Sequence, residues 1–148
     1  MKRATAVNPD QLDLWFEIPQ EPTATGGSLD YATELRHVLS DAITASGKNR
    51  YEIAAEMSRL TGIEVTKAQL DAWTAESRTV WRFPFEYAAA FEVATGSYSL
   101  VDLLTRKRGC KAYWGREAVM LELGRLEKDE QELKRRKSKL KQLLGDEA

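Results

Sequence analysis

Residues 51–73 read YEIAAEMSRLTGIEVTKAQLDAW, and this stretch decides the fold. Its apolar residues recur at spacings that place them on one face of a helix, and they form two sets: Ile53, Ala54 and Met57, then Leu70 and Trp73. Gly62 lies between the sets and can adopt the positive φ that ends a helix. Thr66 precedes the second set, where its hydroxyl can accept a hydrogen bond from the first free backbone N–H groups. The stretch therefore predicts two short helices separated by a glycine turn.

This pattern resembles the helix-turn-helix of lambda-repressor-like regulators, and more closely the phage regulatory proteins of the CII type and small regulators of Mu-like prophages. The matching residues are Ile53, Ala54, Met57, Gly62, Ile63, Thr66, Leu70 and Trp73, then Arg82-Phe83-Pro84, Phe91, Ala94-Thr95-Gly96 and Leu103-Leu104. The resemblance covers about residues 31–110. The chain departs from the pattern by an extra helical turn at 58–61 and a longer loop at 64–65. Leu60 follows Met57 by three residues, so we expect the extra turn to keep its apolar face inward.

The resemblance implies a transcriptional regulator whose second helix enters the major groove of double-stranded DNA. The positions that match the family's DNA-facing residues are Thr66, Lys67, Ala68, Gln69, Asp71, Ala72 and Ala75. Lys67 and Gln69 can bond bases or phosphates, whereas Asp71 repels phosphate and the alanines offer only close approach or contact with a thymine methyl group. We therefore expect weak binding by one copy and stronger binding by a dimer.

Two further groups of cations are candidate DNA contacts. The first flanks Trp81 in an aromatic-rich loop, although packing of that ring into the core is favoured over exposure. The second gives four cations within six residues at a helix end, where they can either touch phosphate or complement the helix dipole. The residues are Arg78 and Arg82 in the first group, and Arg106, Lys107, Arg108 and Lys111 in the second.

The periodicity of the whole chain predicts an all-α fold in three parts: a flexible tail at 1–28, the helix-turn-helix body at 29–110 and a long helix at 111–148. Within the body, a first helix capped by Ser28 or Asp30 should run to about Ser46. A later helix should run from Pro84 through Val93, and a shorter one from Ser99 to about Lys107. The apolar residues expected in the core are Leu35, Val38, Leu39, Ala42, Ile43, Phe85, Ala88, Ala89, Phe91, Leu100, Val101, Leu103 and Leu104.

Composition limits the function. The net charge of −1 gives no overall basic field, so any DNA binding must come from local patches. One Cys and one His permit neither an internal disulfide nor a Cys/His zinc cluster. We find no catalytic triad, phosphate-binding loop or metal-ligand spacing, and so expect no enzyme, catalytic residue, metal or cofactor. No apolar run reaches the ~20 residues that span a bilayer, so we expect a cytoplasmic, nucleoid-associated protein of a bacterial host and no membrane partner.

The tail contains a short apolar cluster that resembles the peptide by which bacterial proteins dock into the sliding clamp. Its matching residues are Gln11, Leu12, Leu14 and Phe16. An extended segment of this kind buries two or three apolar anchors in a preformed groove. The alternative, that Trp15 and Phe16 pack on the chain's own core, is favoured because such short motifs often occur by chance.

The C-terminal segment predicts a short coiled coil. Val119, Leu126, Leu133 and Leu140 are spaced by seven, Leu123 and Leu144 occupy companion positions, and Glu130 and Lys137 form two polar layers. A parallel pair would set Glu130 against its own copy, whereas an antiparallel pair could bring it near Lys137. Self-association is favoured over a helix packed back on the body.

Two classes of function remain. The first is a DNA-binding regulator that acts as an oligomer through the C-terminal helix. The second is a non-catalytic adaptor that uses the tail or the coiled coil to recruit a partner.

Overall fold

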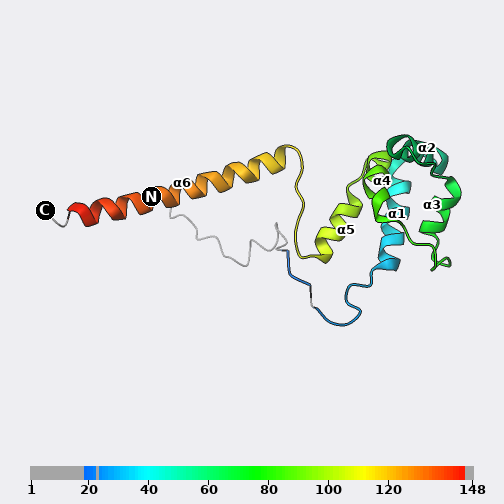
Figure 1. Cartoon of the computed structure of the whole chain (residues 1–148), viewed down its shortest axis with the longest axis horizontal. Helices are drawn as coiled ribbons and strands as arrows, with labels where there is room; N and C mark the ends of the chain where they lie inside the picture. The colour runs from blue at the N-terminus through cyan, green and yellow to red at the C-terminus, as the bar shows by residue number, and fades with distance from the viewer. Residues whose placement is uncertain (1–18, 23, 146–148) are drawn as a thin grey trace, which may run out of the picture. The chain divides into compact units, whose positions relative to one another are not determined.

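The computed structural model describes residues 19–22 and 24–145, and within these ranges it contains helices and no strands (Figure 1). Contacts divide the chain into two compact units, 1–112 and 113–148. The helices are α1 (Ala32–Ser46), α2 (Arg50–Thr61), α3 (Lys67–Thr74), the 3-10 turn η2 (Phe85–Tyr87), α4 (Ala88–Thr95), α5 (Ser99–Lys107) and α6 (Arg116–Gly145). The prediction of an all-helical fold with a long C-terminal helix is therefore confirmed. The predicted docking peptide in the tail lies outside the described residues.

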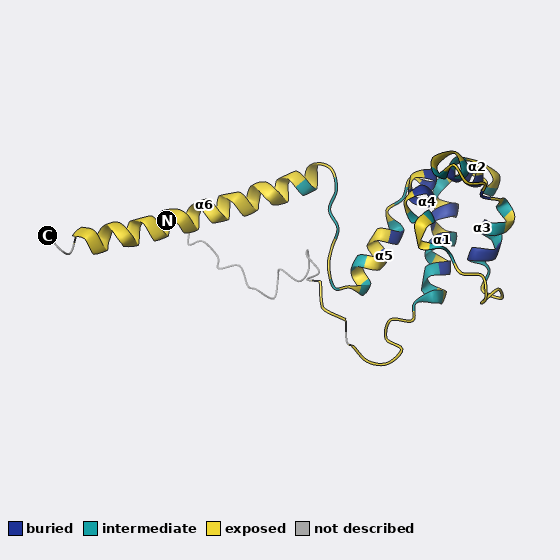
Figure 2. Ribbon diagram, viewed as in Figure 1, coloured by how far each residue is buried: buried dark blue, intermediate teal, exposed yellow. Residues whose placement is uncertain are grey.

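The first unit buries one apolar core between α1, α2, α3, α4 and α5 (Figure 2). Its most deeply buried side chains are Leu39, Ile53, Met57, Leu70, Phe91 and Leu103. Three aromatic rings extend the core next to Phe91: the Phe83 ring lies 5.2 Å from Trp73 and 5.7 Å from Phe91, and Tyr87 lies 5.6 Å from Trp73. Phe91 is thus linked through two edge-on contacts of Phe83 to Trp73 on α3, and these contacts help to hold that helix in place.

The turn between α2 and α3 forms as the sequence predicts. Gly62 ends α2 in the left-handed region at φ 70°, and Thr66 caps α3. The extra turn of α2 and the longer loop are joined to each other, since the Ser58 hydroxyl donates to the Ala54 carbonyl and accepts from the Val65 N–H, each at 2.8 Å. Val65 itself is buried in the core. The last turn of α2 and the loop before α3 are therefore held together by this hydroxyl.

Several core predictions are wrong, for local reasons. Leu60, in the last turn of α2, is 39% exposed, whereas Val65 of the following loop is buried in the core. Pro84 is extended at ψ 131°, so the α-helix begins only at Ala88 after the 3-10 turn. Phe83 and Tyr87 take the core positions on either side, which leaves Phe85 77% exposed. Val101 and Leu104 are exposed on the outer side of α5.

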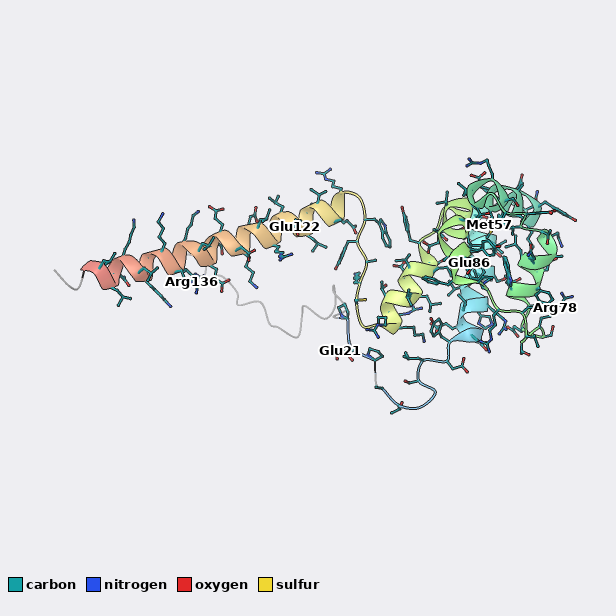
Figure 3. All side chains as sticks on the ribbon, viewed as in Figure 1. Glu21, Met57, Arg78, Glu86, Glu122 and Arg136 are labelled. Carbon is teal, nitrogen blue, oxygen red and sulfur yellow. The ribbon has the colours of Figure 1, made fainter. Side chains whose placement is uncertain are left out.

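Helix α6 is described by itself as the second unit. It has 30 residues, and none of them is buried. Its side chains include the labelled Glu122 and Arg136, in the N-terminal and C-terminal halves of the helix (Figure 3). Among the described helices, none is both long and apolar enough to cross a membrane.

Candidate nucleic-acid interface

Helix α3 packs on α1 and α2 through one side and leaves a narrow outer face. Ala68 is exposed on that face, with Lys67 and Asp71 half-buried beside it. Ala72 is only 3% exposed, so its assignment to the DNA-facing set is wrong. The reason is that a helix of two turns held between two others buries one flank as well as its inner side.

The charged residues of α3 form a small network. Lys67 Nζ lies 2.6 Å from Asp71 Oδ2, and Arg50 Nη1 lies 3.3 Å from Asp71 Oδ1. The Arg50 guanidinium also donates to the Thr74 hydroxyl at 2.9 Å, and Lys67 lies over the Tyr51 ring at 5.7 Å. Two cations therefore share one carboxylate, which leaves the network with a net positive charge. Asp71 orients these cations toward the outer face in addition to repelling phosphate.

Thr66 and Gln69 form a capping box at the start of α3. The Thr66 hydroxyl accepts from the Gln69 N–H at 3.2 Å, and Gln69 Oε1 accepts from the Thr66 N–H at 2.8 Å. Thr66 and Gln69, which the sequence predicts as DNA contacts, therefore also stabilise the start of α3 through these hydrogen bonds. The bonds of the capping box engage the Gln69 oxygen and not its amide nitrogen, so the amide donors remain on the outside of the helix.

The loop after α3 carries Arg78 and Arg82, the predicted cations that flank Trp81. Trp81 is 55% exposed between exposed Arg78 and Arg82, so the preference for packing of this ring is wrong. Trp73 and Phe83 already occupy the aromatic part of the core. Figure 3 shows Arg78 beyond the end of α3.

A buried arginine holds this loop in place. Arg36 on α1 is 7% exposed, and its Nη2 donates to the carbonyls of Arg78 at 3.5 Å and Thr79 at 3.3 Å. Its Nε has no hydrogen-bond partner among the described residues. The side chain borders a hollow of about 230 Å³ that Trp81 and Arg82 also line. The sequence analysis missed Arg36 and Arg50, although Arg36 precedes Leu39 by three residues and so shares the buried stripe of α1.

The cations at the end of α5 have a different role. Arg106 Nη2 lies 3.0 Å and Lys107 Nζ 2.5 Å from the carboxylate of Glu34 on α1, and Lys107 also lies over the Tyr31 ring at 5.8 Å. The hydrogen bond from Lys107 lowers the pKa of Glu34 and outweighs the opposing effect of desolvation, with further lowering by the charges of Lys107 and Arg106. Arg108 is exposed. In Figure 1, α5 and α3 lie on opposite sides of α1. Tyr31, which lies under Lys107, also borders the hollow that Arg82 lines.

An apolar groove of about 570 Å³ opens on the α5 side of the body. Exposed Phe85, Val101 and Leu104 line it, together with Tyr31 and Leu35 of the α1 segment. A groove of this size and lining is typical of a protein or peptide contact. Within the described ranges, no three His, Cys, Asp or Glu side chains gather so as to hold a metal ion.

Comparison with known proteins returns no match: no protein-family model, curated protein or solved structure is similar to this chain.

Proposed function

We propose that this chain is a DNA-binding regulator of the phage or prophage type, which binds double-stranded DNA through α3 and the following loop and self-associates through α6. The observation that carries the proposal is the geometry of α2 and α3. A capped helix is docked on its predecessor through Leu70 and Trp73, and it presents exposed Ala68 beside the network of Lys67, Asp71 and Arg50.

The chemistry of this face suits close approach to a duplex. Ala68 has only a methyl group, so the helix backbone can come near the groove without a steric barrier. Lys67 and Arg50 lie beside it as phosphate or base donors, and Arg78 and Arg82 extend the positive surface past the end of α3. About three phosphate contacts per body would make the logarithm of the binding constant fall by roughly three per decade of salt.

The test is an electrophoretic shift with DNA that flanks the gene of this protein. Ala68→Glu places a carboxylate on the outer face of α3, and we expect it to weaken binding at least about tenfold through repulsion of phosphate. Ala89→Glu is the matched control, because Ala89 is an exposed alanine on α4. Equal binding by both variants and the parent, with unchanged helicity, would reject the assignment of α3 to the groove.

The structure also decides which alanine substitution is informative. Lys67→Ala removes a donor from the outer face and should weaken specific binding by about 1–3 kcal/mol if Lys67 contacts a base. Gln69→Ala removes half of the capping box and should cost about 1 kcal/mol of helix stability, so its effect on DNA binding is not a clean measure of contact.

The apolar groove favours a second function, that of a non-catalytic adaptor. Its exposed Phe85, Val101 and Leu104 give a partner protein an apolar surface that does not include α3. A bacterial sliding clamp bound through residues 11–16 would serve the same class of function. An adaptor predicts partner binding that is unaffected by Ala68→Glu and no shift of the flanking DNA.

A further inference from the structure

We propose that α6 pairs with α6 of a second copy in the antiparallel orientation, in the register that sets Val119 of one copy beside Leu144 of the other. This inference rests on the self-association in the proposed function and is independent of DNA binding. It follows from the distribution of charge along the helix.

The apolar seam of α6 is uncovered within its own unit. Val119, Leu123, Leu126, Leu133, Leu140 and Leu144 are between 56% and 73% exposed. Together with Glu130 and Lys137, they are spaced alternately by four and three residues along the 30-residue helix, which is the spacing of a coiled-coil seam. Exposed leucines at this spacing have a natural partner in an identical seam.

The seam has two polar positions, Glu130 and Lys137, and charged residues line both of its edges. On one edge, each charged residue directly precedes a seam residue: these are Glu122, Asp129 and Arg136. On the other edge, each directly follows a seam residue: these are Glu127, Lys134 and Lys141. Acidic edge residues thus lie in the N-terminal half and basic ones in the C-terminal half. The edges of a coiled coil contact the partner helix, so their charges set its orientation.

A parallel pair places like charges together at two of its three edge contacts, Glu122 with Glu127 and Arg136 with Lys141, and opposite charges only at the third, Asp129 with Lys134. In that arrangement the edge of one copy that carries Glu122, Asp129 and Arg136 lies along the edge of the other copy that carries Glu127, Lys134 and Lys141. Glu127 then lies between Glu122 and Asp129, and Arg136 lies between Lys134 and Lys141. The seam adds two more conflicts, since Glu130 and Lys137 each face their own copy.

An antiparallel pair reverses these contacts. In the proposed register, a residue of one copy faces the residue of the other copy for which the two numbers add to 263. The facing pairs are Val119 with Leu144, Leu123 with Leu140, Leu126 with Lys137, and Glu130 with Leu133. Every seam residue then has a partner. Sliding the pair by one heptad leaves two seam residues of each copy without one.

In this register the charged edges are complementary away from the twofold axis, whereas each Asp129 and each Lys134 also approaches its own copy at the axis. Glu127 of one copy lies between Lys134 and Lys141 of the other, and Arg136 lies between Glu122 and Asp129. The two Glu130 side chains approach each other at the twofold axis, where both Lys134 side chains flank them. Within one helix, Lys134 Nζ is already 2.6 Å from Glu130 Oε1. Lys137 meets a leucine and can extend its ammonium group past the seam to water.

The first experiment measures mass by light scattering of the full chain without DNA. We expect two chains per particle at tens of micromolar, by order of magnitude. A monomer or a larger assembly at that concentration overturns the proposal. Because no DNA is present, this outcome says nothing about DNA binding, which the electrophoretic shift tests separately.

Charge reversal then tests the orientation. Glu127→Lys puts a third lysine between Lys134 and Lys141 in the antiparallel pair, and should weaken the dimer roughly three- to thirtyfold. In a parallel pair the same change puts a lysine between two acids and tightens the dimer. Glu132→Lys is the control, because it makes the same change of charge on the outer side of the helix. A dimer that is tighter, or as strong as the control, overturns the antiparallel assignment.

Cysteine cross-linking gives an independent measure. In a Cys110→Ser background, Leu123→Cys and Leu140→Cys should each fail to form a disulfide alone, and should form one when the two variants are mixed and oxidised. A disulfide needs Cα atoms about 4.4–6.8 Å apart, whereas these residues are 17 positions and about 26 Å apart along a parallel pair. Disulfides within each variant alone, and none between the two variants in the mixture, would establish the parallel arrangement instead.

Discussion

Trp73 and Trp81 provide a direct test of how the first unit is held together, because the two side chains are chemically identical and lie on one connected segment. Trp73 is 4% exposed and contacts the Phe83 and Tyr87 rings, whereas Trp81 is 55% exposed. We predict that Trp73→Ala strongly destabilises the unit and that Trp81→Ala does not.

The magnitude follows from the burial and the ring contacts. Replacing a buried tryptophan by alanine costs about 3–5 kcal/mol through lost transfer energy and the cavity that remains. The two aromatic contacts of Trp73 place it toward the upper end of that range, at about 4–5 kcal/mol. Trp81→Ala removes a ring that is more than half in water, and should cost about 0.5 kcal/mol.

Urea unfolding followed by far-ultraviolet circular dichroism measures both variants without relying on tryptophan emission. The midpoint of the cooperative transition should fall sharply for Trp73→Ala and stay near the parent for Trp81→Ala, with the slope unchanged. A loss below 1 kcal/mol for Trp73→Ala would refute the arrangement of α3 on the core. A loss for Trp81→Ala as large as that for Trp73→Ala would show that the loop ring is buried.

Three further predictions concern the ends of the molecule and its pH response. The lowered pKa of Glu34 stabilises the folded state above its ordinary value of 4.5, and this contribution is lost as pH falls through the lower folded value. Glu34→Gln should therefore be less stable than the parent at pH 7 and match it near pH 2 in thermal unfolding. Removing residues 113–148 should leave a folded first unit that no longer forms dimers and that binds DNA more weakly. Light scattering measures the number of chains per particle, and an electrophoretic shift measures the DNA affinity. A peptide of residues 11–16 with its flanks should bind the sliding clamp at micromolar strength if it docks, and fluorescence anisotropy would show no binding if it instead packs on the body.

The glycine turn and the cap of α3 could be predicted from the sequence because both depend on neighbouring residues only. Gly62 and Thr66 act through backbone geometry and hydrogen bonds that reach three residues along the chain. The same is true of the long helix, whose repeat is a property of one segment. Such features need no knowledge of the other helices.

The errors have the opposite origin. Whether Phe85 or Trp81 is buried depends on which rings reach the core first, and Phe83 and Tyr87 fill those positions. The burial of Ala72 depends on both α1 and α2. No pattern within one segment carries this information.

The residues of the candidate site also fall into those that the sequence of one segment predicts and those that depend on other helices. Lys67 and Ala68 follow from the spacing of α3, but Arg50 comes from another helix and changes the meaning of Asp71 from a repelling charge to an orienting one. Arg36 is a stronger case, because it fixes the loop of Arg78 from 42 residues away in the chain.

The limited charge of the α3 face makes the pairing of α6 important for any function on DNA. Asp71 offsets one of the two cations beside Ala68. On the proposed function, one body would therefore make few net contacts with phosphate. Linking two bodies converts the second binding event into an intramolecular one, but only if both can reach the duplex at once. An antiparallel pair attaches the bodies at opposite ends of a bundle about 45 Å long, whereas a parallel pair attaches them side by side. Glu127→Lys, by changing the dimer and leaving α3 intact, should therefore reduce DNA affinity at low protein concentration and have no effect once the protein is concentrated enough to pair.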